Sequence, residues 1–192
     1  MPPTIVVQPF LNLSPEQRQA TVRLRAIHFS KDKTFPENLT RFESPRLAQP
    51  DAREIHSVVE NSDEWAESGN TLIAGAELIQ RELILPETNQ RLSVLGLLGV
   101  CVHPDYQKQG YGRRVVESCF EISRREGKIC LFQTDVPEFY DLLNCRRVSN
   151  AFVNSKPSAE ERRNNWWCKA VMIYGDPAEW PQGVVDLNGL AW

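Results

Sequence analysis

No long apolar run occurs anywhere in this 192-residue chain. A membrane-spanning helix needs about 18 or more consecutive apolar residues, so no membrane association is expected. The N-terminus, Met-Pro-Pro-Thr-Ile-Val-Val-Gln, also lacks the basic segment and the apolar core of a signal peptide. A dominant basic stripe is missing too, because 22 Lys and Arg stand against 25 Asp and Glu and the net charge is −3. We therefore expect a cytoplasmic protein that binds neither membranes nor nucleic acid.

The cysteines form no pattern of a disulfide framework or a metal site. There are five, which is an odd number, and no Cys-x-x-Cys occurs. Several lie within apolar segments, which favours reduced, buried thiols in an intracellular protein. Internal repeats, low-complexity stretches and a visible domain boundary are missing as well. With 41% hydrophobic and 24% charged residues the composition is that of an ordinary globular protein, so we expect one domain over residues 1–192.

The apolar residues follow both strand and helix periodicities. A capping box from Ser14 to Gln17, with Pro15 at the first helical position, predicts a helix that runs to about Phe29. Two further helices are predicted over 112–126 and 137–143, and strands over 5–10, 55–59, 71–85, 92–103, 129–134, 148–153 and 167–174. The tail after Gly175 shows little periodicity. This order predicts a mixed α/β fold.

The most informative segment is a turn between an apolar strand and a helix, Gln107-Lys-Gln-Gly-Tyr-Gly112. A helix N-terminus carries unpaired N–H groups and a partial positive charge. The two glycines let a ligand approach that backbone closely, and such an arrangement binds phosphate. Lys108, Arg113 and Arg114 add positive charge around the turn. A tight connection without a ligand is the alternative interpretation of a lone Gly-x-Gly.

Two better-known phosphate loops are excluded. No third glycine follows at the spacing of the dinucleotide-binding fingerprint, and the Gly-Lys-Ser/Thr of a Walker A loop is absent. A metal-dependent phosphate enzyme would need carboxylates near the turn, and only Asp105 lies there.

The turn and its flanks resemble the acetyl-coenzyme A (acetyl-CoA) signature of the GNAT family of N-acetyltransferases, Arg/Gln-x-x-Gly-x-Gly/Ala. Here it reads Val102-x-Pro-x-Tyr-Gln-x-x-Gly-x-Gly112. A second segment at the family's usual distance, Phe139-Tyr-Asp-Leu-Leu-Asn-Cys145, resembles Phe/Leu-Tyr-x-x-x-Gly-Phe. Asn144-Cys145 replaces Gly-Phe there. Because Asn tolerates the left-handed conformation that Gly supplies, we expect the fold to survive with a smaller core side chain.

The resemblance implies a central, mostly antiparallel, splayed sheet of about six or seven strands flanked by helices. It implies acetyl-CoA as co-substrate and no metal ion. The pyrophosphate would lie on the turn, and backbone groups of the splayed central strand would hold the pantetheine arm and polarise the thioester carbonyl. The implied cofactor-binding residues are Val100, Cys101, Val102, Gln107, Lys108, Gln109, Gly110, Tyr111, Gly112 and Arg113. The side chains of the strand are interpreted as core, and a covalent role for Cys101 is not expected.

Tyr140 is the implied catalytic acid. A tyrosine hydroxyl, with a pKa of about 10, can donate a proton to a departing thiolate whose thiol pKa is about 8.5. The alternative is that Tyr140 only packs as an aromatic residue of a short helix.

The general base is not evident. An alkylammonium group has a pKa of about 10.4 and must lose a proton before it attacks. Many relatives carry Glu on the central strand, whereas residues 96–99 here read Gly-Leu-Leu-Gly. Glu77 and His56 are candidates, with an exposed strand charge and a structural imidazole as their alternatives. His103 flanks the turn and is not expected to be the base. An acceptor of low pKa or a chain of water molecules also stays open.

The expected acceptor is the primary amine of a small molecule, and the expected assembly is a monomer or homodimer. The family places the acceptor between segments that correspond to 28–42, 154–166 and the tail. The tail ends in Trp192 and weakly resembles the aminoglycoside 2′-N-acetyltransferase branch. Two alternatives remain, a peptide or protein N-acetyltransferase and a catalytically silent CoA-binding module.

Overall fold

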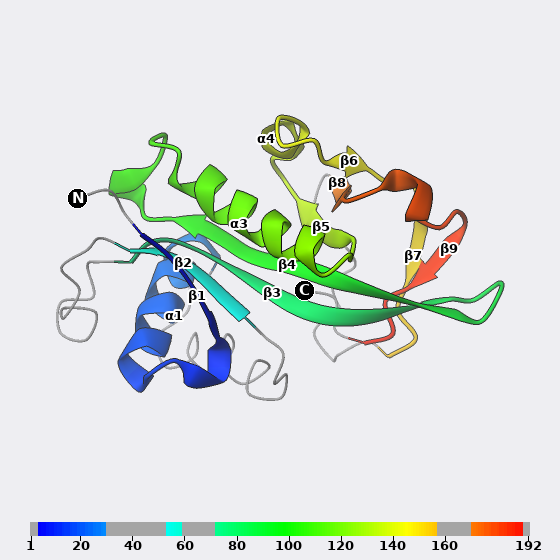
Figure 1. Ribbon diagram of the computed structural model, residues 1–192, viewed down its shortest axis with the longest axis horizontal. Helices are drawn as coiled ribbons and strands as arrows, with labels where there is room; N and C mark the ends of the chain where they lie inside the picture. The colour runs from blue at the N-terminus through cyan, green and yellow to red at the C-terminus, as the bar shows by residue number, and fades with distance from the viewer. Residues whose placement is uncertain (1–3, 30–52, 59–71, 157–169, 190–192) are drawn as a thin grey trace. The chain divides into compact units, whose positions relative to one another are not determined.

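The computed structural model describes residues 4–29, 53–58, 72–156 and 170–189, with backbone alone for residues 4 and 54–58. The chain forms two compact units, the first of residues 1–79 and 97–119 and the second of residues 80–96 and 120–192. Three elements pass from one unit into the other: β3 (Leu72–Leu85), β4 (Gln90–Val102) and α3 (Tyr111–Arg125). β3 and β4 are neighbouring strands joined by the turn 86–89 (Figure 1).

In the first unit the strands follow the order β1-β2-β3-β4. β1 (Thr4–Pro9) pairs antiparallel with β2 (Arg53–Val58), and β2 pairs antiparallel with β3. The short 3-10 helix η1 (Phe10–Asn12) leads into α1 (Pro15–Phe29). The predicted capping box at the start of α1 is confirmed: Gln17 N donates to Ser14 Oγ at 3.2 Å, and Ser14 N donates to Gln17 Oε1 at 2.9 Å. Two orphan donors of the helix are thereby satisfied.

The core of the first unit joins α1 to the sheet. Ala20 and Leu24 of α1 pack with Leu72 of β3 and Cys101 of β4, all of them buried. The 3-10 helix η3 (Pro104–Tyr106) follows β4 and leads into the turn before α3. The first half of α3 buries Val115 and Val116.

The second unit has the strand order β3-β4-β5-β8-β6. β5 (Cys130–Thr134) is parallel to β4, and their ladder joins Leu95 with Cys130 and Gly96 with Leu131. β8 (Ala170–Tyr174) is antiparallel to β5, and β6 (Arg146–Arg147) is antiparallel to β8. Between β5 and β6 lies α4 (Pro137–Asp141), and η4 (Pro177–Glu179) follows β8. The predicted mixed α/β, largely antiparallel fold is confirmed.

An apolar cluster forms the core of the second unit. Its members come from β3, β4, β5, β8 and the chain after β8, and they are Leu83, Val94, Ile129, Leu131, Ile173, Trp180, Val185 and Leu187. The indole of Trp180 satisfies its N–H by donating to Asn150 Oδ1 at 2.6 Å. Trp180 is therefore a core residue.

The structure differs from the prediction at two places. Of the strand expected over 148–153, only the second half is a strand, because the chain leaves β8 after Val148 and re-enters a ladder at β7 (Ala151–Val153). The Asn150 amide between them donates to the carbonyls of Pro181 and Gly183, which ties this corner to the tail. The tail itself contains a strand that its weak periodicity did not predict, β9 (Val184–Asp186), parallel to β7 and antiparallel to β3.

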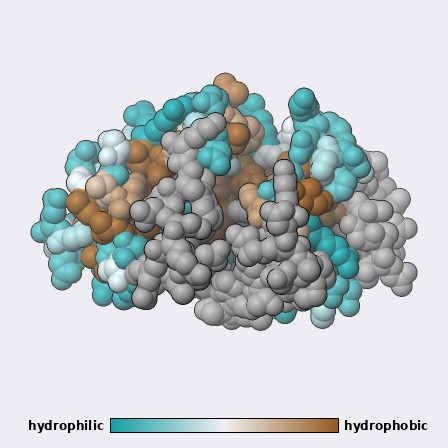
Figure 2. Space-filling view, turned by 180° about the vertical axis from the view of Figure 1, so that it is seen from behind, coloured by the Kyte–Doolittle hydropathy of each residue, from teal (hydrophilic) through white to brown (hydrophobic). Residues whose placement is uncertain are grey.

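On the face seen from behind, hydrophobic residues form separate patches between hydrophilic ones (Figure 2). The most exposed large apolar side chain among the described residues is Leu142, just after α4, at 78%. No helix within the described ranges is long and apolar enough to cross a membrane. Of the five cysteines, Cys101, Cys119, Cys130 and Cys145 are buried thiols, as predicted, and Cys168 lies outside the described residues.

Candidate active site

The end of β4 is covered on both faces by helices of the first unit. Successive strand residues point to opposite faces of a sheet. Cys101 is buried against α1, whereas the side chain of Val102 approaches Gly112 of α3 so closely that a Cβ on Gly112 would lie 3.0 Å from Val102 Cγ2. The predicted strand positions Val100, Cys101 and Val102 therefore lie between two helices, and their side chains belong to the packing, as expected.

The turn after β4 is held by its own side chains. His103 caps η3, with its Nδ1 accepting from Asp105 N at 3.4 Å. Gln107 Nε2 donates to Val102 O at 3.3 Å, and Gln109 Nε2 donates to Asp105 O at 3.1 Å. Both glutamine amides thus bond back to the backbone and fix the conformation of the turn.

The two glycines of the turn have different roles. Gly110 has a φ of +86°, and nothing lies within 4 Å of the place where its Cβ would be. This position needs glycine for its backbone and leaves an open approach at the start of α3. Gly112 is instead a packing glycine that lets α3 lie close to β4. Gly110 therefore has the open backbone that ligand approach requires, whereas Gly112 contacts Val102 of the strand.

The positive charges around the turn are not equivalent. Lys108 is exposed and has a φ of +61°, which is uncommon for a residue with a Cβ. Arg113 Nε donates to Glu117 Oε1 at 2.8 Å along the surface of α3. Tyr111, the first residue of α3, is half-buried with its ring 6.2 Å from that of Tyr106. Of these side chains, Lys108 is the one that the local geometry leaves exposed on the turn itself.

The Val102 carbonyl is already occupied. His28 Nε2, from the last turn of α1, lies 2.8 Å from Val102 O, which also accepts from Gln107. A carbonyl oxygen has two lone pairs. A ligand amide could bond to this oxygen only by displacing one of the two side chains.

A buried ion pair lies beside the same strand. Arg25 of α1 and Glu77 of β3 are 2% and 1% exposed, with Nη2 and Oε2 3.6 Å apart. The expectation that Glu77 is an exposed strand charge is therefore wrong, because α1 covers β3 at this point. Gly99 of β4 has a φ of +56°, and a Cβ there would lie 2.8 Å from Arg25 Nε. Glycine leaves room for the guanidinium against the strand.

Two further histidines came into question in the sequence. His103 uses its Nδ1 as a helix cap, in keeping with the expectation that it is not the base. His56 lies in β2, where the structure describes the backbone only.

Tyr140 belongs to the second unit, where it is 5% exposed at the end of α4. Its ring centroid lies 4.5 Å from that of Phe132 and 4.9 Å from that of Phe139. The aromatic packing named as its alternative role is therefore present, and it fixes the ring. A proton-donor role needs such fixation and is compatible with it.

The segment after Tyr140 agrees with the prediction. Asn144 has a φ of +60°, and Cys145 N donates to Tyr140 O at 3.1 Å across the left-handed turn. Cys145 is buried at the expected core position. Burial, reinforced by the nearby Asp141 charge, raises the pKa of Cys145 to about 12, so it stays a thiol at neutral pH.

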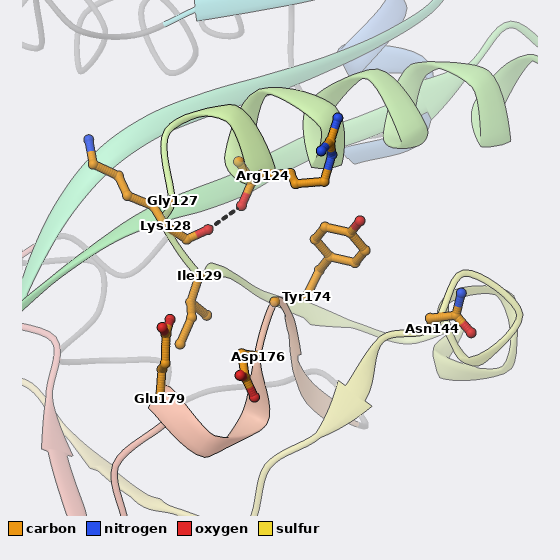
Figure 3. A pocket seen from close by; sticks show the side chains of 10 residues that line it. Arg124, Gly127, Lys128, Ile129, Asn144, Tyr174, Asp176 and Glu179 are labelled. Atoms are coloured by element: carbon orange, nitrogen blue, oxygen red, sulfur yellow. Dashed lines mark hydrogen bonds between the residues drawn. The ribbon is translucent and has the colours of Figure 1, made fainter.

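A pocket of about 400 Å³ lies in the second unit, at the last turn of α3 (Figure 3). The Tyr174 ring projects from the end of β8 toward α3 and stacks on Phe120 at 4.1 Å. The cationic side chains that line the pocket already have partners. Arg124 donates two hydrogen bonds to Glu121, and Lys128 bonds to Gln80 and Glu126. None of the predicted cofactor residues lines it.

Sequence reasoning missed Arg25 and His28. The signal was available, since positions 21, 24, 25 and 28 form the i, i+3, i+4, i+7 stripe of a buried helix face. Thr21, Leu24 and Arg25 on this stripe are buried, and His28 is half-buried. A buried polar side chain is more informative than an exposed one. Much of the predicted acceptor region, 30–42, 157–166 and residues 190–192, lies outside the described residues.

Comparison with known proteins agrees with this geometry. The model of the acetyltransferase (GNAT) family matches residues 24–141, which is more than half of the chain. No match was found among the curated proteins. The turn 107–112 falls within the matched range, which also includes Phe139 to Asp141, the first part of the second segment singled out in the sequence.

Solved structures share the fold. The GNAT family N-acetyltransferase YhbS of Escherichia coli, in complex with CoA, has a TM-score of 0.65 and 14% identity, covering 98% of this chain and 91% of that one. An acyl-CoA N-acyltransferase of Pseudomonas aeruginosa has a TM-score of 0.57 and 12% identity, covering 89% and 96%. A protein of Enterococcus faecalis described as a probable N-acyltransferase has a TM-score of 0.57 and 13% identity, covering 75% of this chain. This chain spans only 33% of that last protein.

Proposed function

This chain belongs to the acetyltransferase (GNAT) family, and on that basis we propose that it binds acetyl-CoA at the turn 107–113 and transfers the acetyl group to the primary amine of a small molecule. The observation that carries the proposal is the open backbone at Gly110, where no atom lies within 4 Å of a hypothetical Cβ. It stands directly before the N-terminus of a 15-residue helix. Free N–H groups and the helix dipole favour a pyrophosphate at such a place.

The rest of the site supplies what the reaction needs. When bound, acetyl-CoA supplies an activated thioester carbonyl. Backbone N–H groups of Val100 to Val102 orient and polarise that carbonyl, and Lys108 adds positive charge near the phosphates. Tyr140 holds the proton that the thiolate takes on leaving. Cys101 is a buried packing residue and forms no covalent bond, so the amine attacks directly.

A small amine is favoured over an acidic acceptor by the net charge of −3. The tail supports a role near the acceptor, because its described part is firmly docked. Gly189 N donates to Asn154 Oδ1 at 3.0 Å, and Asn188 N donates to Asp186 Oδ1 at 2.9 Å. Peptide amines and a silent CoA-binding module remain as alternatives, and the turnover assay described below separates them.

The cofactor site is tested by a pair of glycine substitutions at the two ends of α3. Gly110 and Gly127 both have positive φ, and neither has an atom within 4 Å of a hypothetical Cβ. Alanine therefore strains both positions similarly and fills open space in both. We expect Gly110→Ala to weaken CoA binding about tenfold or more, equivalent to about 1.4 kcal/mol. Gly127→Ala should keep the wild-type affinity in isothermal titration calorimetry.

Equal CoA affinity in the two folded variants would contradict the assigned site. The activity is tested separately by release of free thiol from acetyl-CoA with a panel of small amines, amino acids and peptides. Thiol release with small amines is expected. Release with peptides alone would point to the protein-directed alternative, and CoA binding without any release to the silent module.

A further inference from the structure

Two polar side chains of α1 bracket the strand positions assigned to the thioester. Arg25 and His28 are one helical turn apart and therefore lie on one face of α1. The Arg25 guanidinium lies against Gly99, and His28 Nε2 lies 2.8 Å from Val102 O. Val100 and Cys101 fall between these two contacts along β4. All of these residues belong to the first unit, so the arrangement is internal to one compact body.

The contact with Val102 fixes the tautomer of His28. A carbonyl oxygen can only accept a hydrogen bond, so Nε2 must carry the proton. In the neutral imidazole the lone pair is then on Nδ1, the nitrogen that does not bond to Val102 O. Among the described residues, none bonds to Nδ1. His28 thus brings a basic nitrogen on a ring held against Val102, whereas the central strand itself carries no basic side chain at residues 96–99.

We propose that His28 is the proton acceptor for the amine, through Nδ1, directly or through one water molecule. This inference rests on the proposed acetyl transfer. The ammonium form of the acceptor gives one proton to Nδ1, and the neutral amine nitrogen attacks the thioester carbon. The C–N bond forms, the C–S bond breaks, the nitrogen loses its second proton, and the departing thiolate takes up one proton. His28 then releases its proton to solvent.

Glu77 and His103 do not replace His28 as the proton acceptor. Glu77 is 1% exposed and is paired with Arg25, so it has little access to an acceptor. His103 uses Nδ1 to cap η3. The charged or titratable groups that these elements bring to the end of β4 include Arg25 in α1, Glu77 in β3, Cys101 in β4, and His103 with Asp105 after β4. Glu77 and Arg25 compensate each other, as His103 and Asp105 do when the imidazole is protonated.

Glutamine separates catalysis from structure at this position. His28→Gln can keep an N–H donor toward Val102 O, whereas its amide is not a base at neutral pH. We expect unchanged melting temperature and CoA affinity with a loss of about 10²- to 10⁴-fold in kcat/KM for the amine, the usual range for one acid–base group. In His28→Ala, added imidazole should restore part of the lost rate, and it should do nothing for His28→Gln or the wild type.

A second readout does not use turnover. The ¹⁵N chemical shifts of the His28 imidazole in the protein without CoA should show the Nε2–H tautomer. The Nδ1–H tautomer would overturn the inference, as would a wild-type rate in His28→Gln when chemistry limits turnover. A matched loss of CoA affinity in both variants would also overturn it, since His28 would then position the co-substrate. Thiol release by no amine in the wild type would instead refute the proposed function, and with it any base.

Discussion

The interiors of the two units are built differently. The second unit encloses an apolar cluster of eight buried residues, and its buried Asp186 is satisfied by backbone N–H groups of Ser155 and Asn188, each at 2.9 Å. The described part of the first unit also encloses buried apolar residues and, beside those shared by α1, β3 and β4, the ion pair of Arg25 and Glu77. Desolvation of two charges costs several kcal/mol, and apolar residues of similar volume often stabilise a core as well or better. A gain in stability therefore explains the interior of the second unit. The interior of the first unit instead keeps two charges next to the strand that we assign to the thioester.

The largest expected effect is the loss of stability when one partner of the Arg25–Glu77 ion pair is removed. Arg25→Met or Glu77→Leu alone leaves a buried charge without its main counter-charge and should lower the free energy of unfolding by about 3–5 kcal/mol. The double variant should recover most of that loss or exceed the wild type, because it converts the first interior into one like the second. Urea denaturation measures all three. As a reference, Leu131→Ala in the second unit should cost about 2–5 kcal/mol.

A double variant as unstable as the single ones would show that the pair is needed for folding. Our interpretation also requires that the stabilised double variant lose amine acetylation, since it removes the polar groups next to Gly99. Full activity in that variant would contradict a functional reason for the pair.

Tyr140 tests whether the apolar unit contributes chemistry as well as stability. Tyr140→Phe keeps the ring packed against Phe132 and Phe139 and removes only the hydroxyl. We expect kcat to fall by about 10²- to 10⁴-fold, with little change in CoA affinity. Tyr174→Phe is the matched control, because its ring is likewise held by stacking in the same unit. Similar rates for both variants, with chemistry rate-limiting, would exclude Tyr140 as the acid.

The smallest expected effect concerns Asp186, the buried charge of the second unit. Burial opposes its ionised form, but the hydrogen bonds from Ser155 and Asn188, together with the nearby Lys156 charge, outweigh burial and lower the pKa of Asp186. A carboxylate with a lowered pKa stabilises the folded state above pH 3.8, and this contribution fades as the pH falls through its folded value. Asp186→Ala should therefore cost about 1–3 kcal/mol at pH 7 by leaving two donors unsatisfied.

That cost should shrink when the pH is lowered from 7 toward 3, as urea denaturation at each pH would show. Asp186→Asn keeps an oxygen acceptor and should lose less, without the same pH dependence. A loss in Asp186→Ala that is constant with pH would mean that the carboxylate charge does not contribute.

Local patterns determined much of this protein from the sequence alone. The capping box fixed the start of α1, because both of its hydrogen bonds join residues three apart. The turn 107–112 and the left-handed Asn144 were equally predictable, since a backbone conformation at one residue selects glycine or asparagine. The family resemblance rests on these same short segments, and with them the fold class and the position of the co-substrate turn.

Only the tertiary structure decided the surroundings of β4. Glu77 is buried because α1, some fifty positions away in the chain, covers β3 and brings Arg25 to it. His28 reaches Val102 across 74 positions, and β9 forms because Val184 to Asp186 find partners on β3 and β7. Such contacts depend on which faces of distant elements meet, and no local periodicity encodes that choice. The sequence therefore led to the proposed co-substrate turn, and the packing of α1 on β4 led to the proposed base.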